Sequence, residues 1–293
     1  MKPADVCLAV LVAVIWGSAF VLSRIALDEL SPELMTALRF IIAAIPCLFV
    51  ARPKVSWPTL IAISFTLFLG QFLAQAYGIA GGVPVGLTSV IVQSQALFTI
   101  AFAAVLFGER PTRMQTVGIA IAAIGLLMIC GTVGYDFSVA VFAVLMLSPV
   151  FFAVGNLLLR RAQGVAMFDL FAWLCLVAAV PLLALAVAKN GVAPTWRQLS
   201  HMSLTVLLCM LGIGLISTCF AYWLWGRLLR DYPAAQVVPF ALLVPFVGSL
   251  ASSIVFGETF GRLRLAGMLT VVGGIAVMLL AKRAQNLPKT AGG

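Results

Sequence analysis

The sequence predicts an all-α integral membrane protein whose ten transmembrane helices form two inverted five-helix repeats. Three observations lead to this prediction. Hydrophobic residues make up 63% of the 293 residues and charged residues only 9%, whereas a soluble chain carries about a quarter charged residues. Ten apolar runs have lengths suited to crossing a bilayer. One pattern of residues also occurs twice, 149 positions apart.

The repeated pattern begins with an apolar run that ends in Phe-Gly-Glu. A basic residue follows four positions after the Glu, and glycines follow nine and sixteen positions after it. The first copy is Phe107-Gly108-Glu109 and the second is Phe256-Gly257-Glu258. Pro84 and Pro233 stand at equivalent positions before the two copies. Internal repeats in a membrane chain are typical of transporters.

The apolar runs predict where the ten helices lie. A signal peptide is not expected at the first run, because no small-residue cleavage site precedes a soluble domain. The expected helices are Cys7–Leu27, Pro32–Ala51, Pro58–Ala80, Pro84–Phe107, Met114–Gly131, Val139–Leu159, Phe168–Ala188, Leu204–Arg227, Pro233–Phe256 and Leu263–Ala281.

Ten helices divide into two groups of five. The first repeat is expected over residues 1–134 and the second over residues 135–281, followed by a polar cytoplasmic tail over residues 282–293. Trp16–Arg24 also resembles Phe152–Arg160, since each is an apolar helix that ends in Arg. Because five is odd, the second repeat enters the membrane from the opposite side, which makes the repeat inverted.

The distribution of Lys and Arg predicts that both termini lie in the cytoplasm. With that orientation, twelve of the eighteen basic residues fall on the cytoplasmic side, as the positive-inside rule requires. The twelve are Lys2, Arg52, Lys54, Arg110, Arg113, Arg160, Arg161, Arg227, Arg230, Lys282, Arg283 and Lys289.

Composition also argues against several functions. The net charge of +9 comes from short loops between apolar runs, so nucleic-acid binding is not expected. The six cysteines lie within or beside apolar runs and His201 is the only histidine, so neither disulfides nor a metal site is expected. No phosphate-binding Gly-x-x-x-x-Gly-Lys-Ser/Thr motif is present, so direct use of ATP is not expected. No cofactor is expected.

Several short motifs resemble the drug/metabolite transporter superfamily and its EamA family. They are Trp16-Gly17, Leu38-Arg39-Phe40, Gly86-Leu87-Thr88-Ser89 with Gln93 and Gln95, Phe107-Gly108-Glu109-Arg110, Gly155-Asn156, and Val238-Pro239 with Leu243-Val244-Pro245. The resemblance covers nearly the whole chain and extends to bacterial exporters of amino acids and related metabolites, including the YddG type. It implies a central cavity lined mainly by helices three, four, eight and nine. Many members carry Asn where this chain has Ala19.

Polar amides within the apolar runs are candidates for substrate binding. Gln71 and Gln75 lie four residues apart on one face of the third expected helix. Gln93 and Gln95 lie in the fourth helix, and Asn156 lies in the sixth. An amide in an apolar span needs a partner, which is either a neighbouring helix or a water-filled cavity. Both interpretations stay open for each residue.

Aromatic side chains complete the expected binding site. Trp16 lies in the middle of the first helix, far from the interfacial belt where Trp and Tyr gather. Tyr77, Tyr222 and Trp223 are further candidates for substrate binding, and Tyr77 is equally compatible with the belt. Pro149, Pro239 and Pro245 interrupt hydrogen bonding within helices six and nine and are candidate hinges.

Charged residues suggest how transport is driven. All nine acidic residues map to loops or helix ends, whereas proton-coupled transporters usually carry a buried carboxylate. Facilitated, gradient-driven export is therefore expected. Arg39 lies inside the second helix, where we expect it to reach the interface or to pair with Glu33 or Glu258, the alternative being a substrate carboxylate. Glu109 and Glu258 are expected to cap helices five and ten.

The sequence thus predicts a secondary transporter in the cell inner membrane that exports neutral or aromatic amino acids and related metabolites by alternating access. Its expected partners are a small-molecule substrate and lipid, as a monomer or weak homo-oligomer. A proton-coupled multidrug exporter of the same fold is the alternative, although it calls for a central carboxylate. A membrane-embedded enzyme is less compatible, because paired carboxylates or a His cluster are missing.

Overall fold

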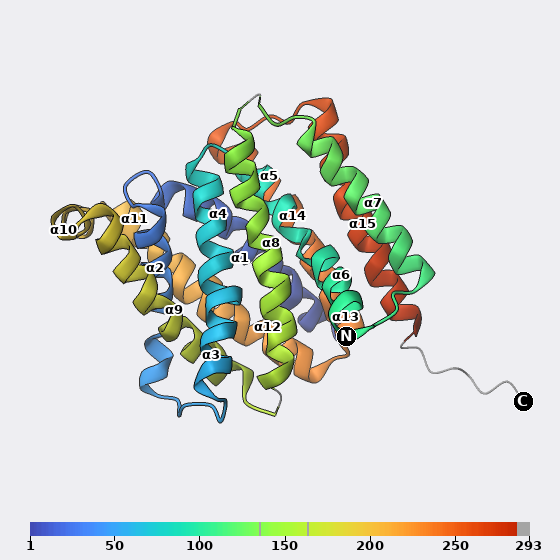
Figure 1. Cartoon of the computed structure of the whole chain (residues 1–293), viewed down its shortest axis with the longest axis horizontal. Helices are drawn as coiled ribbons and strands as arrows, with labels where there is room; N and C mark the ends of the chain where they lie inside the picture. The colour runs from blue at the N-terminus through green and yellow to red at the C-terminus, as the bar shows by residue number, and fades with distance from the viewer. Residues whose placement is uncertain (135, 163, 286–293) are drawn as a thin grey trace, which may run out of the picture.

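The computed structural model describes residues 1–134, 136–162 and 164–285, which form helices joined by short turns, with no β-strand among them. Figure 1 shows the long helices side by side in one bundle, with α7 and α15 together at one edge and α10 at the opposite edge. The α-helices are α1 (Pro3–Ala26), α2 (Pro32–Ala43), α3 (Trp57–Ile63), α4 (Gln71–Ala80), α5 (Val85–Gln93), α6 (Gln95–Phe107), α7 (Arg113–Cys130), α8 (Val139–Leu159), α9 (Met167–Asn190), α10 (Val192–Ser200), α11 (Leu204–Leu211), α12 (Ala221–Asp231), α13 (Ala234–Val237), α14 (Leu243–Phe256) and α15 (Arg262–Gln285). The other helical segments are η1 (Ile45–Leu48), η2 (Ser64–Gly70), η3 (Arg160–Ala162), η4 (Gly212–Phe220) and η5 (Val238–Leu242).

Within the described residues, nine helical stretches are long and apolar enough to cross a membrane. The second expected span is the exception. Its α-helix ends at Ala43 instead of continuing to Ala51, and a 3-10 turn follows. Pro46 lies in that turn and cannot donate a backbone hydrogen bond, which explains the early end. At the other end of the chain, α15 continues to Gln285, so the expected tail starts later; residues 286–293 lie outside the described part.

Local sequence fixes where the helices start. The hydroxyls of Ser31, Ser138 and Ser203 accept hydrogen bonds from the first turns of α2, α8 and α11. Thr112 and Gln115 form a reciprocal capping box at the start of α7. These contacts satisfy backbone N–H groups that a helix start otherwise leaves without partners.

Two crossing helices contain wider, π-helical turns in their middle. One is η2, between α3 and α4, and the other is η4, between α11 and α12. Both lie inside spans that the apolar runs predict, but the local sequence carries no signal for the wider turns. Turns of this kind leave local carbonyl groups with altered partners and are frequent at functional sites.

Two other crossing helices are broken near their middle. The fourth expected helix divides at Ser94 into α5 and α6, and the ninth divides into α13, η5 and α14. Pro239 lies in η5 and Pro245 lies in the first turn of α14, so prolines mark the second break as expected. Pro149 is different, because α8 continues past it from Val139 to Leu159.

The two copies of the repeated pattern adopt matching local structures. Gly108 ends α6 with φ 66° and Gly257 ends α14 with φ 66°, both in the left-handed region that glycine favours. The next helices then begin at Arg113 and Arg262, again 149 residues apart. The helix α10 interrupts this correspondence, because only the four-residue 3-10 segment η1 stands between α2 and α3 at the equivalent place in the first half.

Helices α7 and α15 meet through glycines, as the sequence analysis expects. A Cβ atom built on Gly118 would lie 2.7 Å from the Gly274 carbonyl oxygen, and one on Gly125 would lie 2.8 Å from that of Gly267. The two backbones therefore touch along this line, which we call the glycine seam (Gly118, Gly125, Gly267 and Gly274). Figure 1 shows the two helices lying against each other along their length.

Polar contacts between turns define two ends of the bundle. At the first end, the backbone N of Lys2 donates to the Tyr232 hydroxyl at 3.3 Å, and Arg160 pairs with Glu109 at 2.5 Å. We call this the N-terminal end (N in Figure 1).

The opposite end carries a separate set of contacts. There, Arg264 pairs with Asp136 at 2.5 Å and the backbone N of Ser203 donates to Glu29 at 2.8 Å. Helices that follow one another along the chain and cross the bundle run in alternating directions, from one end to the other and back. This fixes the direction of each helix and therefore the depth of each side chain.

Candidate functional site

Arg39 is buried inside the bundle, with 5% of its surface exposed. Its Nε donates a hydrogen bond of 3.1 Å to the Thr218 hydroxyl in η4. The expectation that Arg39 reaches the interface or pairs with Glu33 or Glu258 is wrong. Glu33 pairs instead with Lys189 at 2.7 Å, and Glu258 binds backbone N–H groups of α5. The reason is depth: Arg39 lies two turns into α2, while both carboxylates lie at the opposite end.

Aromatic rings take the place of a carboxylate beside Arg39. Its guanidinium carbon lies 4.1 Å from the centre of the Phe72 ring and 5.9 Å from that of Phe40. Such cation–π contacts offset part of the cost of removing a charge from water. Within the described part of the chain, Arg39 forms no ion pair. A buried cation without an anion is costly in a membrane and marks a functional site.

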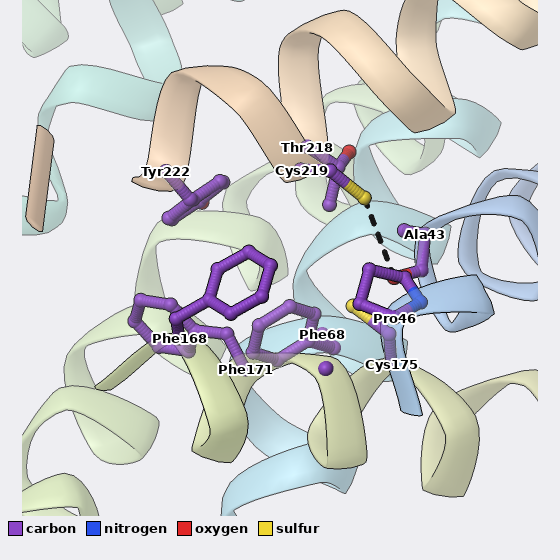
Figure 2. Close-up of a pocket in the computed structure, with 10 residues that line it drawn as sticks. Ala43, Pro46, Phe68, Phe168, Phe171, Cys175, Thr218, Cys219 and Tyr222 are labelled. Atoms are coloured by element: carbon purple, nitrogen blue, oxygen red, sulfur yellow. Dashed lines mark hydrogen bonds between the residues drawn. The ribbon is translucent and has the colours of Figure 1, made fainter. Parts of the chain in front are cut away.

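A first pocket lies on the N-terminal side of Arg39 and, in this conformation, has room for about one water molecule. We call it the aromatic pocket. Its wall includes Phe68, Phe168, Phe171, Cys175, Thr218, Cys219 and Tyr222. Figure 2 shows the rings of Phe168, Phe171 and Phe68 grouped on one side, facing Tyr222, Thr218 and Cys219 from the helix above. The pocket is far smaller than ligand pockets of about 300–1,000 Å³, so a substrate can enter only when the walls move apart.

A second pocket lies on the other side of Arg39 and is equally small, with room for about one water molecule. We call it the polar pocket, because its wall includes Ser23, Thr36, Arg39, Phe72 and Gln75. It lies between the opposite-end halves of α1, α2 and α4, whereas Ala43 and Pro46 carry the aromatic pocket toward the N-terminal end. Arg39 therefore lines one pocket and is hydrogen-bonded to Thr218 in the wall of the other.

The structure distributes the candidate amides over several places. Gln75 lies in the polar pocket, close to Arg39. Gln71 and Gln95 each bury a side-chain oxygen that has no hydrogen-bond partner among the described residues. Gln93 donates to the backbone carbonyl of Ala241 at 3.0 Å and so joins the break after α5 to η5. Asn156 is half-buried in α8 and lines neither pocket.

Trp16 and Tyr222 belong to one aromatic group beside the π-helical turns. The Trp16 Nε1 donates to the Ser217 carbonyl in η4 at 3.1 Å, and its ring lies 5.3 Å from Tyr222 and 5.1 Å from Trp225. Tyr222 continues this group into the aromatic pocket, where its ring meets Phe171 edge-on at 5.2 Å.

The other two aromatic candidates lie away from the pockets. Tyr77 forms a polar cluster with Glu33 and Lys189, and Lys189 donates to its hydroxyl at 2.6 Å. Trp223 is 46% exposed and lines neither pocket. The structure therefore brings Gln75 and Tyr222 to the pockets, with Trp16 in contact, but not Tyr77 or Trp223.

The two repeated glutamates have different hydrogen-bond partners in the structure. Glu258 accepts hydrogen bonds from the backbone N–H groups of Val85 at 2.6 Å and Gly86 at 3.0 Å, so it caps α5. Glu109 pairs with Arg160 at 2.5 Å, and Thr112 caps α7 in its place. The hydrogen bonds therefore place Glu258 at the start of α5 and Thr112 at the start of α7.

Sequence reasoning underestimated Arg39 and missed Thr218 and Phe171. The signal for Arg39 was present, since it is the one basic residue well inside an expected helix. Thr218 and Phe171 carried no signal, because a Thr and a Phe in an apolar run are indistinguishable from packing residues.

The fold and the paired pockets define a multi-pass helical membrane protein with space at its centre. The chain matches the EamA-like transporter family over residues 4–131 and 139–280. It belongs to that family, as its motifs suggested.

Two relatives share this chain's full extent. A Salmonella typhimurium protein named "Probable amino-acid metabolite efflux pump" is 32% identical, covering 100% of both chains. An Escherichia coli protein of the same name is 30% identical and covers 97% of each. A solved crystal structure matches with a TM-score of 0.63 at 20% identity, covering 97% of this chain and 100% of the other, and supports the fold.

Proposed function

We propose that this protein is a secondary transporter that exports amino acids, neutral or aromatic, and related small metabolites across the bacterial inner membrane. One observation carries the proposal: two pockets approach the buried Arg39 from opposite ends of the bundle. A site that each face reaches in turn is the requirement for alternating access. The two full-length relatives named as amino-acid metabolite efflux pumps supply the substrate class.

Ten crossing helices in two inverted repeats, residues 1–134 and 135–281, are part of the proposal. The glycine seam supports it. Gly118 and Gly267 occupy equivalent positions, as do Gly125 and Gly274, and the contacts run from Gly118 to Gly274 and from Gly125 to Gly267. Two copies related by a two-fold axis make reciprocal contacts of this kind. The second crossing is then α2 extended by η1.

Both termini are proposed to face the cytoplasm. Basic residues gather at the N-terminal end, including Arg52, Arg110, Arg160 and Arg230. Such residues are retained on the cytoplasmic side of membranes. The aromatic pocket then lies in the cytoplasmic half of the protein and the polar pocket in the outer half, with residues 282–293 on the cytoplasmic side.

In this mechanism the broken and π-helical segments rearrange while the glycine seam stays closed. Pro239 and Pro245 remove backbone hydrogen bonds at the break before α14, and Pro149 removes one within α8. Export follows the substrate gradient, because neither pocket is lined by Asp or Glu. A multidrug exporter of lipophilic cations fits less well, since Arg39 repels a cation at the same depth.

The test is counterflow of radiolabelled L-phenylalanine in liposomes that contain the purified protein, with and without an imposed pH gradient. We expect exchange that needs only a substrate gradient. Accumulation that requires proton flow would show that export is coupled to protons and would contradict facilitated export. Absence of exchange for every amino acid tested, with exchange of lipophilic cations, would overturn the proposed substrate class.

A further inference from the structure

We infer that Arg39 is the anchor for a substrate carboxylate, and that the protein selects small monocarboxylates without requiring a charged amino group. The inference rests on the proposed export function and narrows it. The ligand class therefore includes N-acylated amino acids, whereas amino-acid amides and esters are excluded.

The first argument is charge. Arg39 is 5% exposed, and its one hydrogen bond to a side chain uses Nε, bound to Thr218. The two terminal nitrogens of the guanidinium have no hydrogen bond to another described residue. Together they present the planar pair of donors that matches both oxygens of one carboxylate. An anionic substrate supplies the negative charge that pairs with the Arg39 guanidinium.

The second argument is position. Arg39 forms part of the polar pocket and touches the wall of the aromatic pocket through Thr218. A carboxylate held there lies beside a small ring-lined pocket, built from Phe68, Phe171 and Tyr222, that can receive an apolar side chain once its walls move apart. Figure 2 shows these rings gathered around the space next to Thr218.

The third argument concerns the amino group. Neither pocket is lined by a carboxylate. Glu33, which lies in the same helix as Arg39, is already paired with Lys189 and bonded to Tyr77. An ammonium group therefore finds only carbonyl, amide and ring partners, and it lies near a fixed cation. Removing its charge by acylation relieves that repulsion.

The experiment compares four competitors in the phenylalanine counterflow assay: L-phenylalanine, N-acetyl-L-phenylalanine, L-phenylalaninamide and L-phenylalanine methyl ester. We expect the N-acetyl compound to compete at least as well as phenylalanine. The amide and the ester should compete at least tenfold less well. Equal competition by amide and acid would overturn the inference while leaving amino-acid export in place.

Two variants separate an anchor from a structural residue. Arg39→Met removes an unpaired buried charge, so the protein should keep or raise its melting temperature while phenylalanine exchange falls at least tenfold. Arg39→Lys keeps the charge without the bidentate geometry and should retain an intermediate rate. Full exchange by Arg39→Met would show that Arg39 is no anchor. Arg264→Met is the matched control, because Arg264 is also buried but is paired with Asp136, and its loss should lower stability.

A measurement on the unmodified protein covers the case in which Arg39→Met fails to fold. Cys175 and Cys219 line the aromatic pocket, whereas Cys7 is exposed. N-acetyl-L-phenylalanine should slow maleimide labelling of the two pocket thiols and leave Cys7 unaffected, and the amide should slow neither. Equal protection by both compounds would contradict selection for the carboxylate.

Discussion

The glycine seam and the walls of the pockets are two ways of joining helices in one bundle. Along the seam, α7 and α15 touch backbone to backbone and leave no space for a Cβ atom. Around Arg39, two of the helices contain π-helical turns, the helices line two pockets, and polar contacts join helix ends. Close packing resists rearrangement, whereas broken helices with polar ties can change partners. The comparison therefore indicates which side of the bundle moves.

The largest effect is expected where the seam is tightest. A Cβ atom on Gly274 would lie 2.5 Å from the Ala122 backbone N, so Gly274→Ala forces the two helices apart. We expect a loss of about 1–3 kcal/mol, as for other overpacked sites. The neighbouring Gly273 faces open space, so Gly273→Ala is the matched control and should be neutral. Thermal unfolding in detergent measures both, and equal melting temperatures would mean that the seam is not tightly packed.

A smaller effect is expected at the contact that links the seam helix to the pocket side. Glu258 precedes α15 and caps α5 through the N–H groups of Val85 and Gly86. Glu258→Ala leaves both donors without this partner, and we expect a loss of about 1–2 kcal/mol. Asp28→Asn serves as control, because Asp28 forms only an exposed pair with Arg24. Equal melting temperatures for the two variants would mean that the Glu258 cap does not contribute to stability.

A substitution at Trp16 affects only the region around the pockets and not the glycine seam. Trp16→Phe keeps an aromatic ring but removes the N–H that donates to the Ser217 carbonyl in η4. We expect a loss of about 0.5–1.5 kcal/mol in stability and a several-fold slower exchange of phenylalanine. Trp196→Phe changes an exposed Trp of α10 and should leave both unchanged. If Trp16→Phe exchanged at the normal rate, the contact with η4 would have no part in transport.

The smallest expected effect is the response of one polar contact to low pH. Glu29 has a pKa below its ordinary value, because its carboxylate is hydrogen-bonded to Ser203 at the start of α11. A lowered pKa in the folded state means that this contact stabilises above the unfolded pKa of about 4.3 and is lost as the pH falls below it. We therefore expect the protection of the first turn of α11 against hydrogen exchange to fall as the pH drops through the folded-state pKa of Glu29, while the protection of α15 stays constant. Glu29→Gln should remove the pH dependence, and loss of protection in both helices would contradict the contrast between the two regions.

The sequence predicts the parts of this structure that depend on local pattern. The apolar runs locate the crossing helices, the spacing of Gly118 and Gly125 predicts close packing, and the motifs predict the family. It fails where a residue's partner lies far along the chain. Glu258 caps α5, whose first residue is 173 positions away, and Arg39 meets Thr218 at a separation of 179. Nothing in the local sequence indicates such partners.

The candidate residues for the pockets also divide into those that local sequence identifies correctly and those that it does not. Tyr222 and Gln75 were identifiable because polar atoms in apolar runs are rare. Tyr77 and Trp223 have the same composition signal but lie elsewhere, since helix rotation, which the sequence leaves open, decides which face meets the centre.

The helix α10 has a consequence for the two states of a transporter built from inverted repeats. If the halves were identical, a two-fold rotation would convert the inward-open state into the outward-open state, and the two states would be equally populated. Only the second half carries α10, and Gln198 in it accepts a hydrogen bond from the Ser31 backbone at 2.9 Å. A contact that forms in only one of the two states makes their free energies unequal. A free-energy difference of about 1.4 kcal/mol changes the ratio of the two states tenfold. A nine-residue helix outside the pockets can thus set which face the empty carrier presents.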